Sequence, residues 1–218
     1  IKKNNIKSCY IRPLAYYGYG QMGVDPTGAP VDVIIAVWPW DAYLGEEALQ
    51  NGIKVGVSSW RQRSFNAIPP AVKSSASYMN SILAKKEATL HGYAEAIMLN
   101  EEGRVCEGTG ENIFVVRNGI LSTPPLSDGL LEGITRDTIL TLATDMDIPA
   151  IEESLTRSDL YIADEAFMTG SAAELTPINS IDDRVIGKRG PITEQLQKRY
   201  FDVAYGKVPE YEDWITRF

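Results

Sequence analysis

Apolar and polar residues alternate over many short runs of this chain and recur at helical spacing in a few longer ones. A period of two is typical of half-buried strands, and a period near 3.6 is typical of amphipathic helices. The alternation predicts strands over residues 6–17, 31–38, 53–60, 94–100, 104–107, 112–116, 120–122, 149–153, 165–169, 175–182 and 184–186. The helical spacing predicts helices over residues 74–91, 135–145, 157–163 and 192–205. This mixture predicts a fold of the α+β or α/β class.

One break divides the pattern into two domains. Pro39, together with Trp40 and Tyr43, interrupts the chain directly after the apolar strand over residues 31–38. We place a domain boundary there. The strand over residues 53–60 then begins the second domain.

Local turn and cap signals support these elements. Asn118-Gly119 stands between two predicted strands, and this dipeptide favours a two-residue hairpin turn. His91 and Gly92 follow the helix over residues 74–91. A histidine in the last turn can cap the helix, and glycine is the usual residue just beyond it.

Composition narrows the functional classes. The 218 residues carry a formal net charge of −8 with a pI near 4.8, which argues against nucleic acid or an anionic membrane as a partner. No apolar run approaches the roughly 20 residues that a membrane-spanning helix needs. Two cysteines are too few for a disulfide framework, which indicates a reducing cytoplasm. With a single histidine, His91, we expect neither a metal site nor a histidine-based nucleophile.

Lys73 is the candidate catalytic residue. It follows the apolar run 68–72 (IPPAV) and precedes the small residues 74–76 (SSA). A lysine among such neighbours is expected to be desolvated, which disfavours its ammonium form and frees an amine for carbonyl chemistry.

Glu107 and two glycine-led turns are further candidates. Glycines 108 and 110 flank Glu107, and a carboxylate with that room could keep a ring nitrogen protonated. Gly133 precedes the helix that contains Thr135, whose free N–H groups suit a phosphate, and Gly170–Ala173 could form an anion-binding turn. Each has a structural alternative: an exposed turn glutamate, an N-cap threonine and an ordinary β-turn.

Tyr10 and Arg12 are a candidate pair in the first predicted strand. They are two residues apart, so they project from the same face. A guanidinium beside a phenol could receive a carboxylate. The structural alternative is a solvated arginine beside a half-buried tyrosine.

Seven motifs occur together in one order over nearly the whole chain. They are YIRPL (10–14), QMGV (21–24), VDVIIAVWPWDAYLG (31–45), IPPAVKSSASY (68–78), EGTGENIF (107–114), LLEGITRD (130–137) and DEAFMTGSAAELTP (164–177). Together they resemble the fold-type IV pyridoxal-phosphate enzymes, and most closely the branched-chain amino acid aminotransferases.

This resemblance implies a site for pyridoxal 5′-phosphate. Lys73 would bind the cofactor and move the proton, while Tyr78 would bond the cofactor's O3′ oxygen and Glu107 its pyridine nitrogen. The implied cofactor-binding residues are Lys73, Tyr78, Glu107, Asn112, Leu131, Gly133, Ile134, Thr135 and Ser171. The implied substrate-binding residues are Tyr10, Arg12, Trp40, Gly170, Ser171 and Ala172.

The resemblance also implies domains and assembly. Residues 1–38 would be the last part of the family's small N-terminal domain, 39–49 an interdomain loop, and 50–218 the large cofactor-binding domain. This large domain would have a barrel-like β core flanked by helices. The chain has no initiator methionine, so we expect that an N-terminal segment, with the arginine that grips the phosphate, is absent. The family's assembly implies a homodimer or hexamer.

The implied activity is transamination of L-leucine, L-isoleucine and L-valine with 2-oxoglutarate, which gives 2-oxo acids and glutamate. Two alternatives on the same fold are a D-amino-acid aminotransferase and an aminodeoxychorismate lyase, and both YIRPL and EGTGEN argue against them. An alternative of another class is an inactive fragment that serves as a binding or assembly module.

Overall fold

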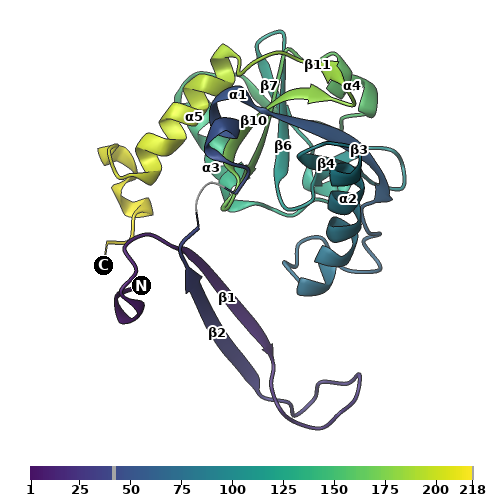
Figure 1. Cartoon of the computed structure of the whole chain (residues 1–218), viewed down its shortest axis with the longest axis vertical. Helices are drawn as coiled ribbons and strands as arrows, with labels where there is room; N and C mark the ends of the chain where they lie inside the picture. The colour runs from purple at the N-terminus through teal and green to yellow at the C-terminus, as the bar shows by residue number, and fades with distance from the viewer. Residues whose placement is uncertain (41–42, 218) are drawn as a thin grey trace. The chain divides into compact units, whose positions relative to one another are not determined.

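The computed structural model describes residues 1–40 and 43–217, and the chain divides into two compact units, Ile1–Tyr43 and Leu44–Phe218 (Figure 1). The first unit contains a 3-10 helix, Lys2–Asn4, and an antiparallel hairpin of β1 (Tyr10–Tyr17) and β2 (Val31–Trp38). Tyr10 pairs with Trp38, the last residue of β2. The first strand therefore begins later than predicted, because residues 6–9 have no partner strand.

The second unit is built on a nine-stranded mixed sheet in the order β5-β4-β3-β10-β9-β6-β7-β8, with β11 paired to β10. The strands are β3 (Ile53–Arg61), β4 (Glu95–Leu99), β5 (Val105–Gly108), β6 (Asn112–Arg117), β7 (Ile120–Thr123), β8 (Ala150–Glu152), β9 (Glu165–Gly170), β10 (Glu174–Ile181) and β11 (Arg184–Val185). Strand β3 runs parallel to both β4 and β10, and β7 runs parallel to β8.

The sheet curls into a half-barrel, in agreement with the predicted fold class. The edge strand β5 bonds to the chain beyond β8, since the Val105 N–H donates to the Leu155 carbonyl at 2.8 Å. At its other end, the Gly108 N–H donates to the Glu111 carbonyl at 2.6 Å. The first contact joins one edge of the sheet to the chain beyond the other edge, and the second places the end of β5 beside the start of β6.

Helices flank this sheet. They are α1 (Glu46–Asn51), α2 (Tyr78–Leu90), α3 (Ile134–Asp145), α4 (Arg157–Tyr161) and α5 (Pro191–Ala204), with 3-10 helices at Ser75–Ser77, Leu126–Asp128 and Pro209–Trp214. Helix α2 begins later than predicted, because Ser74 caps a 3-10 turn before it. Helix α1 starts inside the segment predicted as a loop, and its first-turn acids Glu46 and Glu47 favour a helix N-terminus. Within the described residues, no helix is both long and apolar enough to cross a bilayer.

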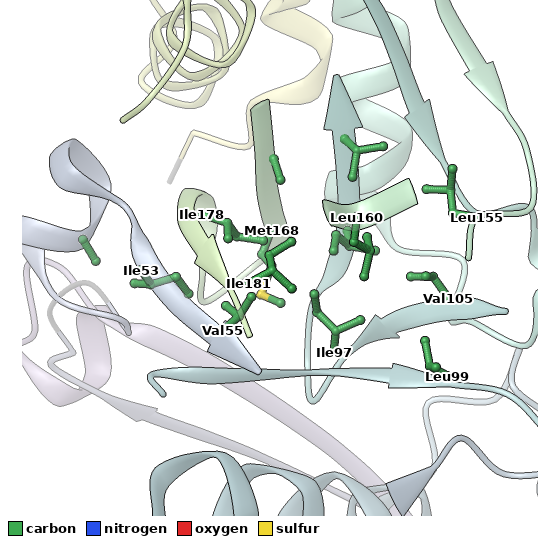
Figure 2. Close-up of a cluster of buried hydrophobic side chains, with 14 residues drawn as sticks. Ile53, Val55, Ile97, Leu99, Val105, Leu155, Leu160, Met168, Ile178 and Ile181 are labelled. Atoms are coloured by element: carbon green, nitrogen blue, oxygen red, sulfur yellow. The ribbon is translucent and has the colours of Figure 1, made fainter. Parts of the chain in front are cut away.

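Two apolar layers hold the second unit together. Figure 2 shows the layer inside the curl, to which β3, β4, β5, β9 and β10 contribute. The layer on the other face joins β6 and β9 to α3 and α5, where the rings of Phe114 and Phe167 stack with centroids 5.0 Å apart. Burying a side chain of this size contributes about 1.5–3 kcal/mol. The strand ends that carry the candidate residues are therefore firmly supported.

The predicted turn and cap are confirmed. Asn118 and Gly119 both have positive φ, 51° and 78°, as a two-residue turn between β6 and β7 requires. His91 is the C-cap residue of α2, and Gly92 follows it with φ 82°.

Candidate active site

Glu107 lies on β5, and three donors fix its carboxylate. The Gln62 side-chain amide donates to Oε1 at 2.5 Å. The Leu131 N–H donates to Oε2 at 3.0 Å, and the Asn112 amide donates to the same oxygen at 3.4 Å. The side chain is only partly exposed, so the alternative of a solvated turn glutamate is wrong.

These surroundings change the acidity of Glu107. Burial raises its pKa from 4.5 to about 7, against the Leu131 hydrogen bond and the positive charges of Arg63 and Lys73, which lower it. Near neutral pH the carboxyl group is therefore close to its midpoint. A further cation beside it would favour the ionised form.

Asn112 connects Glu107 to the start of α3. Its amide also donates to the Leu131 carbonyl at 2.9 Å. A Cβ atom at Gly133 would lie 2.0 Å from the Asn112 Oδ1 atom, so any other residue at this position would displace the Asn112 side chain. The bond to Leu131 and the contact with Gly133 hold the chain before α3 against the strand that carries Glu107.

The N-terminus of α3 offers an anion site next to this connection. Gly133 is the N-cap residue, and the Asp137 N–H closes the first helical turn onto the Gly133 carbonyl at 3.0 Å. The amides of Ile134 and Thr135 precede that bond, so the helix itself does not use them. Thr135 is the second residue of the helix and Gly133 is its N-cap, so the predicted alternative of a threonine N-cap is wrong.

The second glycine-led turn lies at the same end of the sheet. Strand β9 ends at Gly170, and residues Ser171–Ala173 turn the chain into β10. Strand pairing sets Thr169 opposite Asn112, and a Cβ atom at Gly170 would lie 3.4 Å from the Gly110 carbonyl oxygen. The turn therefore lies beside the glycine loop that follows Glu107.

Lys73 lies in the connection between β3 and α2. Its Nζ atom is 5.8 Å from the centroid of the Tyr78 ring, and its charge lowers the pKa of Glu107. The side chain is exposed, as are its neighbours Ala71 and Val72, so the predicted desolvation is wrong. The apolar neighbours in sequence do not pack around the amine, because the segment is a loop.

Tyr10, Arg12 and Trp40 lie in the first unit. As predicted, Tyr10 and Arg12 share a face, and the Arg12 guanidinium donates to the Tyr10 hydroxyl at 2.9 Å. Trp40 packs edge-on against Tyr10, with ring centroids 4.8 Å apart. This arrangement belongs to unit Ile1–Tyr43, whereas the other candidates lie in unit Leu44–Phe218.

Sequence reasoning missed Gln62 and Arg63. Gln62 is 4% exposed, and its side-chain oxygen accepts the Arg63 N–H at 3.2 Å while its nitrogen donates to Glu107. The Arg63 guanidinium donates to the Ser77 carbonyl and lowers the pKa of Glu107. The available signal was the polar run 61–63 (RQR), which stands directly at the end of β3.

A cleft of about 630 Å³ lies elsewhere, between β3, the end of α2 and the turn after β10. Two of its carboxylates are already bonded. Glu87 accepts hydrogen bonds from Ser58 and Ser59, and Asp182 pairs with Arg157 at 2.6 Å. None of the candidate residues lines it.

Comparisons with known proteins agree with this arrangement. The profile of the amino-transferase class IV family matches residues 1–181. The branched-chain-amino-acid aminotransferase of Pseudomonas aeruginosa is 50% identical over 218 residues, which are 99% of this chain and 71% of that protein. The protein of the same name from Escherichia coli strain K12 is 46% identical over 220 residues, 100% of this chain and 71% of that protein.

Solved structures of other proteins indicate the same family. The branched-chain aminotransferase of Thermoproteus uzoniensis, crystallised with norvaline, has a TM-score of 0.94 and 47% identity, over 99% of this chain and 71% of that one. The holo form of the Thermobaculum terrenum enzyme, with its pyridoxal phosphate, has a TM-score of 0.92 and 39% identity, over 99% and 70%. The chain therefore belongs to the amino-transferase class IV family, among its branched-chain-amino-acid aminotransferases.

The groups present fit pyridoxal 5′-phosphate, the cofactor of this family. The carboxylate of Glu107 suits a protonated ring nitrogen, and the amides of Ile134 and Thr135 suit a phosphate. The Lys73 side chain is exposed, so its amine is accessible to an aldehyde. The fit thus rests on the chemistry of three separate groups in one unit.

Proposed function

We propose that this chain transfers the amino group of L-leucine, L-isoleucine or L-valine to 2-oxoglutarate, producing 2-oxo acids and glutamate. The observation that carries this proposal is the Glu107 carboxylate, which is held by three donors and interacts electrostatically with Lys73. The names of the relatives support the choice of substrates.

Four residues would serve the cofactor ring. The bound pyridoxal phosphate supplies an electron sink and carries the amino group. Lys73 would hold the cofactor at its aldehyde carbon and, once the substrate amine has displaced it, would act as the base and acid that moves a proton at the substrate α-carbon. Glu107 would keep the ring nitrogen protonated, Tyr78 would bond the O3′ oxygen, and Leu131 would pack on the ring face.

The remaining residues would bind the two anionic groups. Gly133, Ile134, Thr135 and Ser171 hold the phosphate, and Asn112 supports Glu107. The turn at Gly170, Ser171 and Ala172 would receive the substrate carboxylate. In the first unit, Tyr10, Arg12 and Trp40 are further proposed substrate-binding residues. Backbone amides and an arginine are well suited to carboxylate and phosphate oxygens.

We also propose the domain division and the assembly. Residues 1–38 belong to a small domain, 39–49 to an interdomain loop and 50–218 to the large cofactor-binding domain. The chain forms a homodimer or hexamer in the cytoplasm, and two free cysteines support that compartment. Helix α2 exposes Met79, Ile82 and Leu90 by 64%, 61% and 73%, an apolar surface of the kind that subunit interfaces cover. A single-chain mass in light scattering contradicts this assembly.

The proposal is tested by measuring substrate turnover and the colour of the protein after loading with pyridoxal phosphate. The purified protein, loaded with pyridoxal phosphate, is offered L-leucine or D-alanine with 2-oxoglutarate. Turnover of L-leucine supports the proposal, and turnover of D-alanine alone favours a D-amino-acid enzyme. The loaded protein should be yellow, and borohydride should remove that colour while leaving the cofactor covalently joined to Lys73, as mass spectrometry would show. A protein that stays colourless favours a binding module.

A further inference from the structure

A second glutamate lies buried beneath the loop that carries Glu107. Glu111 is 5% exposed, and its Oε2 atom accepts the Gly110 N–H at 3.0 Å. A Cβ atom at Gly108 would lie 2.7 Å from that same oxygen. A Cβ atom at Gly170 would lie 3.8 Å from the Glu111 Cγ atom. The side chain therefore packs against both glycine-led turns of the site, and the absence of side chains at those glycines makes room for it.

A second buried carboxylate shares this region. Glu95 on β4 is 0% exposed and pairs with Lys85 of α2 at 2.7 Å. Its other oxygen accepts the Thr109 hydroxyl and the Ala96 N–H, both at 2.7 Å. Glu111, by comparison, accepts a hydrogen bond from a backbone amide, the Gly110 N–H. The two carboxylates thus differ: Glu95 pairs directly with a lysine at 2.7 Å, whereas burial outweighs the opposing effects of Gly110 and Lys85 at Glu111.

This difference determines the cost of ionising Glu111. If both carboxyl groups were ionised, two negative charges would be buried next to each other, which is costly. Burial and the charge of Glu95 raise the pKa of Glu111 to about 8, with a smaller contribution from Glu107, while the Gly110 N–H and Lys85 oppose the rise. Burial beside Glu95 therefore favours the neutral form of Glu111.

We propose that Glu111 is a positioning residue which, in its neutral form, supports the loop after Glu107 and the turn Gly170–Ala172 so that they receive the substrate carboxylate. This inference rests on the proposed function, in which that turn binds the carboxylate. Ionised Glu111 places a negative charge behind the turn and repels the substrate. Binding of the carboxylate therefore weakens as the pH rises through the titration of Glu111, whereas the chemical step changes less.

The experiment measures binding of 4-methylvalerate to the cofactor-loaded protein from pH 6.5 to pH 9.5. This probe has the carbon skeleton and carboxylate of leucine but no amino group, so it does not itself titrate over this range. For the wild type, we expect the affinity for 4-methylvalerate to fall roughly tenfold from neutral to alkaline pH, because ionised Glu111 would place a like charge a few ångströms behind the site. Glu111→Gln copies the neutral form, so it should bind 4-methylvalerate as the wild type does at pH 7. Its affinity should not fall at alkaline pH.

Two further variants sharpen the test. Glu95→Gln keeps an oxygen for Thr109 and Ala96 but removes the charge that opposes ionisation of Glu111, so the loss of affinity should move to lower pH. Glu102→Gln, at an exposed turn, should bind as the wild type at every pH. In the cofactor-free protein, urea unfolding should show that the wild type loses stability relative to Glu111→Gln as the pH rises toward 8.

The outcomes distinguish the role proposed for Glu111 from the proposed function. A Glu111→Gln variant whose affinity falls with pH in parallel with the wild type overturns the role of Glu111. If that variant does not fold, an unchanged pH profile in Glu95→Gln overturns it instead. A wild type that binds cofactor but does not turn over L-leucine contradicts the proposed function, whatever Glu111 does.

Discussion

Lys73 and Glu107 occupy opposite kinds of surroundings. Lys73 is exposed in a loop between β3 and α2, whereas Glu107 lies on a strand with three hydrogen-bond donors around its carboxylate. The comparison indicates that the amine proposed to react is carried by a solvent-facing segment, whereas the carboxylate whose pKa it lowers is carried by the sheet. Substitution of Lys73 should therefore change the chemistry without changing stability, whereas substitutions around Glu107 should change both.

The largest effect is expected for Lys73→Ala. Loss of the group that moves the proton should lower kcat by about 10⁴-fold or more. Because the side chain is exposed, the free energy of unfolding should stay within about 0.5 kcal/mol of the wild type. Steady-state turnover of L-leucine and urea unfolding measure the two quantities. The control is Lys86→Ala, an exposed lysine of α2, which should keep full activity. Wild-type turnover in Lys73→Ala would refute the mechanism.

The sequence proposed Lys73 as the catalytic residue, but it did not predict the environment of the side chain. The motif around Lys73 pointed to the residue through its resemblance to a family. The physical argument from apolar neighbours failed, because neighbours in sequence shield an amine only when the tertiary structure packs them around it. Ala71 and Val72 are exposed in the loop, so they do not shield it.

The sequence predicted the strands and glycines around Glu107, but it did not predict which groups donate hydrogen bonds to the carboxylate. Alternation and the Asn-Gly turn predicted the hairpins that place Glu107 and Asn112 at strand ends. Gln62 is 45 residues from Glu107 in sequence, and Leu131 is 24 residues away. No local pattern pairs residues at such separations, because the curl of the sheet brings them together.

Glu107→Gln should have the next largest effect on turnover. An amide cannot hold a proton on the ring nitrogen by charge, so kcat should fall by about 10²–10³-fold while cofactor binding persists. Rapid-mixing absorbance with L-leucine isolates the proton-transfer step. Exchange of solvent deuterium at the α-carbon provides an independent measure. Equal rates in wild type and variant would show that Glu107 does not control the ring.

The same substitution should change the pH dependence of stability in the cofactor-free protein. Burial raises the pKa of Glu107 from 4.5 to about 7. The folded state then binds more protons than the unfolded state between these values, so the free energy of unfolding falls as the pH rises across that window. Glu107→Gln should remove about 1–3 kcal/mol of this fall between pH 4.5 and pH 8. Urea unfolding at both pH values checks it, and parallel slopes would contradict it.

Gly133→Ala should lower the free energy of unfolding, because Gly133 contacts Asn112 directly before α3. The new Cβ atom would lie 2.0 Å from the Asn112 Oδ1 atom, so the buried amide must move and weaken its bonds to Leu131 and Glu107. We expect a loss of about 1–3 kcal/mol in urea unfolding. Gly110→Ala, which meets nothing within 4 Å, is the matched control for stability. Adding Asn112→Ala should relieve the clash, so additive losses in the double variant would argue against this contact.

The smallest effect is expected at Tyr78, whose ring lies beside Lys73. The ring of Tyr78 is 5.8 Å from the Lys73 Nζ atom, so Tyr78→Phe keeps the ring beside the amine and removes only the hydroxyl. If the hydroxyl bonds the cofactor, kcat/KM for L-leucine should fall by up to about tenfold, the value of one hydrogen bond. The absorption maximum of the bound cofactor should shift as well, because O3′ loses a donor. Tyr93→Phe, whose hydroxyl donates to Asp183 at 3.0 Å, removes a similar exposed hydroxyl elsewhere and should leave both quantities unchanged. A Tyr78→Phe variant with unchanged kcat/KM and spectrum would limit Tyr78 to packing beside Lys73.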